Sequence, residues 1–126
     1  MNLKQLFIIN FFIAVFFGIS CVIFASWVLK LYGLVPTDAS IWTTRLVGGS
    51  ILGFSSLMLF GSKAASIDVR RAIAYALLIQ DLFGFIASLE IQLSGSINVL
   101  GWSSPVLYGL LSLGYAYFLF VRPSAS

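Results

Sequence analysis

Three ionisable side chains lie within long apolar stretches of the sequence, where a charge needs a partner. Arg45 lies near the start of one stretch, and Asp81 and Glu90 lie in the next. An ionisable residue inside a membrane-spanning segment indicates a functional site, such as a proton relay or a cation site. The alternative is a polar clasp between two helices. The sequence favours the clasp, because no histidine, lysine or second acid accompanies Asp81 at its level.

The arginine is followed by glycines at helical spacing. Gly49 and Gly53 lie four and eight positions after Arg45, so the three residues share one face of a helix. A Gly-x-x-x-Gly pattern lets two helices approach closely in lipid. We therefore expect a neighbouring helix to pack on this face and to supply a partner for Arg45. The alternative is that the arginine side chain extends to the lipid headgroups.

Two acids compete as that partner. Glu90 lies at about the depth of Arg45, whereas Asp81 lies roughly 15 Å along its helix, near the bilayer midplane, where a partner matters more. The acids are nine residues apart and therefore lie on opposite faces of a straight helix. Both face Arg45 only if the helix bends at Gly84. In a further alternative, a protonated Asp81 donates a hydrogen bond to a carbonyl group or to Asn10.

A second group of polar residues lies around the last connector. Glu90, Gln92 and Asn98, together with Arg45, suggest a small outward-facing polar cup that binds a ligand. The alternative is a turn in which Asn98 and neighbouring serines satisfy backbone groups. The sequence favours the turn.

Residue types that most enzymes and metal sites need are scarce. The chain has no histidine and one cysteine, Cys21, which removes the commonest metal ligand and any Ser-His or Cys-His catalytic pair. Its net charge of +3 is spread along the chain, whereas nucleic-acid binding needs a basic stripe. We therefore expect no enzymatic activity, no metal or other cofactor, and no nucleic-acid partner.

The composition indicates that lipid surrounds most of the chain. Of its 126 residues, 60% are hydrophobic and 9% are charged, whereas a soluble domain carries about 25% charged residues. Four apolar stretches are long enough to span a bilayer as helices, which takes roughly 20 residues. They cover residues 6–29, 41–61, 71–93 and 104–121.

Short connectors join these stretches and are rich in the residues typical of turns. The predicted fold is therefore all-α, with one integral membrane domain over residues 1–126. It is a four-transmembrane-helix antiparallel bundle with up-down topology. The alternative for the first stretch is a cleaved signal peptide, but its apolar core exceeds the roughly 7–15 residues of a signal core.

Basic residues near the predicted helix ends indicate the orientation, since they accumulate on the cytoplasmic side. One side has only Lys30 and Arg45, and also Trp27, Trp42 and Trp102, which favour a membrane interface. We therefore expect both termini to be cytoplasmic. The basic residues on the cytoplasmic side are Lys4, Lys63, Arg70, Arg71 and Arg122.

Three short motifs carry a resemblance. They are Arg45-x-x-Gly48, the run R-R-A-I at 70–73, and a turn containing Gly95, Asn98, Leu100, Gly101 and Trp102. With them, the chain resembles a group of small, uncharacterised bacterial four-helix integral membrane proteins over nearly its whole length. The resemblance implies only the topology and no activity. The location that we expect for the chain is a bacterial inner membrane.

Two other resemblances are more distant. The R-x-x-G motif is similar to one in the four-helix sterol-biosynthesis scaffold protein of the endoplasmic reticulum, which implies a tethering role by analogy of fold. The small multidrug transporters match in length and helix number. Their signature glutamate in the first helix is absent here.

These observations leave three functions open. The sequence favours a non-enzymatic membrane protein that acts through helix–helix contacts, as an accessory or scaffold subunit of a larger membrane complex or as a homo-oligomer. Its partners are membrane lipid and other membrane-protein subunits or itself. The second function is a small proton-, ion- or solute-coupled transporter or channel that uses Asp81. The third is a binder of a lipid, quinone or pigment between the helices.

Overall fold

The computed structural model of the chain describes residues 1–123, which form helices and turns without a β-strand. Four segments are long and apolar enough to cross a membrane, which confirms the predicted all-helical class with four candidate spans. Three of them are single helices, and the fourth, Val99–Val121, combines three helical pieces. The elements are α1 (Leu3–Ile23), α2 (Ala25–Leu31), α3 (Asp38–Lys63), α4 (Ile67–Leu93), η1 (Val99–Trp102), α5 (Ser103–Ala116) and η2 (Tyr117–Val121).

Side-chain caps determine where the first three long helices begin. At the start of α1, Gln5 N donates to Asn2 Oδ1 and Asn2 N donates to Gln5 Oε1, both at 3.0 Å. Thr37 and Ser40 make the same reciprocal pair at the start of α3, and the Ser66 side chain caps α4. These bonds satisfy backbone N–H groups that the first helical turn leaves unpaired.

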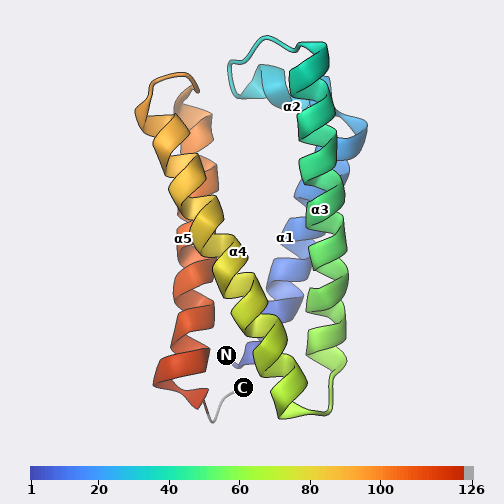
Figure 1. Cartoon of the computed structure of the whole chain (residues 1–126), viewed down its shortest axis with the longest axis vertical. Coiled ribbons are helices and arrows are strands. Elements are labelled where there is room, and N and C mark those ends of the chain that lie inside the picture. The colour runs from blue at the N-terminus through green and yellow to red at the C-terminus, as the bar shows by residue number, and fades with distance from the viewer. Residues whose placement is uncertain (124–126) are drawn as a thin grey trace.

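The helix predicted over residues 6–29 is in fact two helices. The backbone leaves the helical conformation at Phe24 (φ −113°, ψ 37°), and α2 then lies across one end of the bundle (Figure 1). One turn earlier the Ser20 hydroxyl donates to the Phe16 carbonyl at 2.7 Å, a type of bond that often bends helices. After α2 the chain reverses at Gly33, whose φ of +79° favours glycine.

The long helices associate as two pairs, α1 with α3 and α4 with α5 (Figure 1). Glycines set the closest approach within each pair. A Cβ atom added at Gly48 of α3 would lie 2.8 Å from the carbonyl oxygen of Gly18 on α1. One added at Gly84 of α4 would lie 2.6 Å from the ring of Tyr108 on α5. A side chain at Gly48 would therefore push the backbones of α1 and α3 apart, and one at Gly84 would displace the Tyr108 ring.

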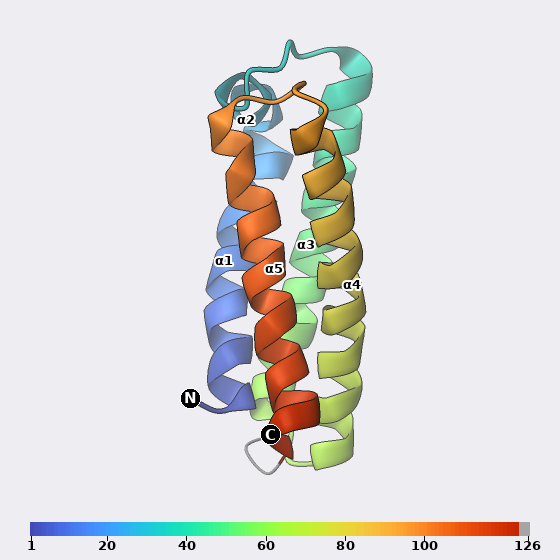
Figure 2. The same ribbon diagram turned by 90° about the vertical axis from the view of Figure 1, so that its left-hand side faces the viewer.

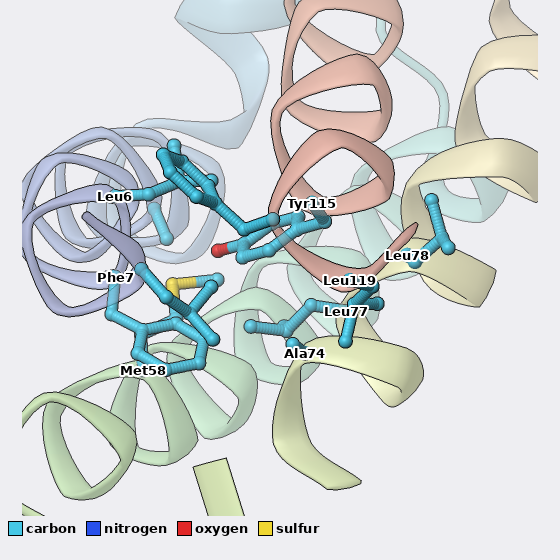
Figure 3. Packing of buried hydrophobic residues seen from close by; sticks show 11 residues of the cluster. Leu6, Phe7, Met58, Ala74, Leu77, Leu78, Tyr115 and Leu119 are labelled. Carbon is cyan, nitrogen blue, oxygen red and sulfur yellow. The ribbon is translucent and has the colours of Figure 1, made fainter. Parts of the chain in front are cut away.

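The two pairs meet in a hydrophobic core at the end of the bundle opposite α2 (Figure 3). The N-terminus lies at this end (Figure 2). Tyr115 of α5 is fully buried there, and its ring centroid lies 5.9 Å from that of Phe7 on α1. All four long segments contribute to the core. Its members are Leu3, Leu6, Phe7, Ala14, Met58, Ala74, Leu77, Leu78, Tyr115, Phe118 and Leu119.

The outer faces of the helices are also strongly apolar. Phe12 and Phe16 of α1, Phe83 of α4 and Leu113 of α5 are each 67–69% exposed. Apolar side chains exposed over such an area indicate an environment of lipid rather than water. The structure therefore supports a multi-pass membrane protein.

Candidate functional site

A cavity of about 190 Å³ lies between the two helix pairs. Most of its wall is apolar, with side chains such as Phe17, Ile51, Phe54, Leu107 and Leu111. Engineered apolar cavities of about 150 Å³ already bind benzene, so this space is large enough for a small organic molecule. The polar or ionisable side chains on the wall are Asn10, Cys21, Tyr32, Gln80, Asp81, Ser104 and Tyr108.

The cavity continues toward α2. A second hollow of about 580 Å³ shares five lining residues with it and reaches the connectors at that end. The opposite end is closed by the hydrophobic core, to which Ala14 and Met58 of the cavity wall also belong. The space therefore runs from the α2 end to the middle of the bundle. The shared residues are Cys21, Val28, Tyr32, Val47 and Ser104.

Asp81 lies at the inner part of this cavity. Its α4 neighbours Ala74, Leu77 and Leu78 are buried core residues, and Asp81 continues the same face of the helix by one turn. The side chain is only 2% exposed, yet its Oδ2 atom has no hydrogen-bond partner among residues 1–123. A buried acceptor without a donor costs about 1–3 kcal/mol, and a charged one costs more. The carboxyl group therefore needs a proton or a ligand.

Gln80, the preceding residue, presents a second unpaired acceptor. It also lines the cavity, and its Oε1 atom is buried without a hydrogen-bond partner among the described residues. Two adjacent residues thus leave hydrogen-bond acceptors unsatisfied beside the same space. Sequence reasoning did not single out Gln80, although a polar residue next to Asp81 in an apolar helix was a usable signal.

Asn10 is buried on the cavity wall, as expected from its position in the first helix, but it does not bond to Asp81. Its side-chain amide donates to the Tyr115 hydroxyl at 2.7 Å. Tyr115 was not among the residues expected at the site. The signal for it is the spacing of Tyr108, Ser112 and Tyr115, which places all three on the inner face of α5.

The structure corrects the expected role of Arg45. The side chain is exposed, and no ion pair joins it to Asp81 or Glu90 within the described part of the chain. Within residues 1–123 nothing lies within 4 Å of a Cβ atom added at Gly49 or Gly53, so none of the described helices packs on their face. The reason is a rotation of α3, whose buried face carries Gly48, Ser55, Met58 and Gly61 instead.

The structure brings together only two of the four residues expected to form the polar cup. Gln92 and Asn98 come together, because Gln92 Nε2 donates to the Asn98 carbonyl at 3.1 Å. Asn98 Nδ2 donates to the Leu31 carbonyl at 2.8 Å, and Asn98 N donates to the Tyr32 carbonyl at 3.1 Å. Arg45 and Glu90 are exposed and take no part in these bonds. The polar groups of Asn98 thus satisfy backbone groups and tie its connector to α2.

Comparison of the chain with protein-family models, with curated proteins and with solved structures found no match. Among residues 1–123, no group of three or more His, Cys, Asp or Glu side chains is placed to hold a metal ion. The cavity at Asp81 is therefore the feature of the described chain from which a function is best argued.

Proposed function

We propose that this chain is a non-enzymatic membrane protein that binds a small, mostly apolar molecule in its central cavity. One observation carries the proposal: a carboxylate that is 2% exposed and lacks a hydrogen-bond partner lies on the wall of a cavity of about 190 Å³. Binding pockets are concave and mainly apolar, with a few polar groups that orient the ligand. The candidate ligands are a lipid, a quinone or a pigment, of which the cavity would hold a part of this size.

The test compares what copurifies with three forms of the protein taken from its own membrane in mild detergent. Ala14 lines the cavity, so Ala14→Leu partly fills it, whereas Ala76→Leu adds the same atoms on an exposed position of α4. Mass spectrometry of organic extracts should find a molecule with the native protein and with Ala76→Leu that is lost from Ala14→Leu. Identical extracts from all three forms, or no bound molecule, would contradict the proposal.

We also propose that the bundle is antiparallel, with both termini in the cytoplasm, and that it lies in a bacterial inner membrane. Support comes from two contacts between α1 and α3: Gly61 near the end of α3 meets Phe7 near the start of α1, and Gly48 in the first half of α3 meets Gly18 in the later part of α1. The excess of basic residues at the end opposite α2 supports the orientation. Reporter fusions after residue 126 and within residues 33–37 test this orientation. The first fusion should report the cytoplasm, and the second should report the opposite side of the membrane.

A carrier function is a second candidate, in which Asp81 couples solute binding to a proton or cation. The observation that favours it is the asymmetry of the space, which extends toward α2 and is closed by the core at the other end. Alternating access requires such a one-sided opening. Solute flux into proteoliposomes should be lost in Asp81→Asn and retained in Asp68→Asn, an exposed acid of α4. Equal flux in both variants would count against it.

The uncovered face of α3 favours a third candidate, a scaffold or accessory subunit that acts through helix contacts, including contacts with itself. Arg45, Gly49 and Gly53 remain free for this because none of the other helices described in residues 1–123 covers them. In a Cys21→Ser background, Gly49→Cys should form a disulfide-linked dimer in native membranes, whereas Leu113→Cys on exposed α5 should not. Equal crosslinking at both positions would indicate random collision in the membrane.

A further inference from the structure

The unpaired polar atoms at the inner part of the cavity share one property. Asp81 Oδ2 and Gln80 Oε1 are both hydrogen-bond acceptors, and both are buried without a donor within residues 1–123. The side-chain amide of Asn10, also on the wall, donates to the Tyr115 hydroxyl instead. No hydrogen bond joins the Tyr108 hydroxyl to Asp81. The ligand that complements these atoms is therefore a hydrogen-bond donor.

The charge of the wall narrows the choice further. Its titratable groups are Asp81 of α4, Cys21 of α1, Tyr32 after α2, and Tyr108 of α5, while α3 contributes none. The wall includes no Lys, Arg or His side chain, so an ionised Asp81 leaves one uncompensated negative charge. In a low-dielectric interior such a charge is either neutralised by a proton or stabilised by a positive charge close by. A neutral or anionic ligand does not provide one.

The remainder of the wall favours an organic cation over a metal ion. Hard metal cations such as Ca²⁺ and Mg²⁺ require about six or more oxygen ligands, whereas the buried unpaired acceptors on the wall belong to one carboxylate and one amide. An ammonium group needs only a few acceptors. Phe17, Phe54 and Tyr108 also line the cavity, and aromatic faces attract organic cations. The apolar surface suits a body about as large as one aromatic ring.

We infer that the cavity binds a small lipophilic primary amine as its ammonium cation, with the charged group on Asp81 and Gln80 and the apolar body among the phenylalanines. This inference rests on the proposed binding function and specifies the class of ligand. Charge-assisted hydrogen bonds are about twice as strong as neutral ones. The cavity should therefore distinguish an amine from an alcohol of the same shape.

The experiment uses a matched pair of probes on the purified full chain in lipid nanodiscs, with empty nanodiscs subtracted. Radiolabelled 2-phenylethylamine is the cationic probe, and 2-phenylethanol is its neutral counterpart. The native protein should bind the amine about tenfold or more tightly than the alcohol. Asp81→Asn should reduce this preference to within about twofold, whereas Asp68→Asn, outside the cavity, should retain it.

A second measurement needs no variant. Because protons compete for the Asp81 carboxylate, amine binding to the native protein should weaken as the pH falls, while alcohol binding should stay constant. Equal affinity for both probes, or an amine preference that persists in Asp81→Asn, overturns the inference but leaves a ligand-binding cavity in place. Binding of neither probe, together with an empty extract from the native protein, overturns the proposed function as well.

Discussion

Two adjacent glycines of α3 should respond in opposite ways to the same substitution. A Cβ atom at Gly48 would lie 2.8 Å from the Gly18 carbonyl oxygen and 2.8 Å from Cys21 Cβ. Because one of these neighbours is backbone, α1 as a whole must shift to make room. A Cβ atom at Gly49 has no neighbour within 4 Å in the described part of the chain. We therefore expect Gly48→Ala to destabilise the protein and Gly49→Ala not to.

The difference between the two variants can be estimated, since both replace glycine by alanine inside one helix. The gain in helix propensity, about 0.5–1 kcal/mol in water, is common to both and cancels. What remains is the cost of overpacking at the contact of α1 with α3, which is typically about 1–3 kcal/mol. The free energy of unfolding of Gly48→Ala should thus be about 1–3 kcal/mol below that of Gly49→Ala.

Reversible unfolding in mixed micelles of a mild detergent and dodecyl sulfate, followed by circular dichroism, measures this difference at low protein concentration. Dilution keeps any self-association through the Gly49 face out of the comparison. If Gly49→Ala were as destabilising as Gly48→Ala, the α3 face described here would be wrongly assigned. A neighbouring helix would then pack on the face of Gly49 and Gly53.

Other polar side chains of the bundle are testable by single substitutions. Asn98→Ala removes the side-chain hydrogen bonds to the Leu31 carbonyl and from Leu100 N. Hydrogen exchange at the backbone amides of Gly33 and Leu34 should therefore accelerate severalfold. Unchanged exchange would show that these bonds do not hold α2 in place. Asn10→Leu and Tyr115→Phe each break the 2.7 Å hydrogen bond between the two side chains. A double-mutant cycle on the free energy of unfolding should give a coupling energy of about 0.6–1.7 kcal/mol, as measured for such bonds in membranes. Strictly additive effects of the two substitutions would contradict the bond. Asp81→Leu removes a buried, unpaired acceptor and should raise the free energy of unfolding of the ligand-free protein by about 1 kcal/mol or more. A free energy of unfolding below that of the native protein would indicate that Asp81 has a stabilising partner.

The four spans follow from the sequence because the bilayer imposes a length on any helix that crosses it. The break at Phe24 does not, since neither proline nor glycine marks it. The choice of packing face was wrong for a related reason. Gly48 and Gly49 are adjacent, and a helical period alone does not decide which of them meets a neighbour. That depends on the position of Gly18 on α1, which is a tertiary property.

The candidate site was predictable in part. An acid near the middle of a membrane helix and an asparagine in the first helix were both expected to face inward, and both line the cavity. Their partners were not predictable, because the Asn10 bond reaches Tyr115 across 105 positions of the chain. The cavity beside Asp81 was not predictable either, because it depends on how the two helix pairs separate toward α2.

The contacts between the two helix pairs differ in strength at the two ends of the bundle, and this difference has a kinetic consequence. At one end the pairs share a core of eleven side chains, whereas near α2 the connector is tied mainly by the bonds that Asn98 makes to the backbone of Leu31 and Tyr32. Such bonds contribute only about 0.5–1.5 kcal/mol each, so thermal motion breaks them far more often than it disrupts the core. If the proposed ligand leaves the cavity past α2, its residence time and the lifetime of the folded chain are set by different residues, so that substitutions can change one without the other.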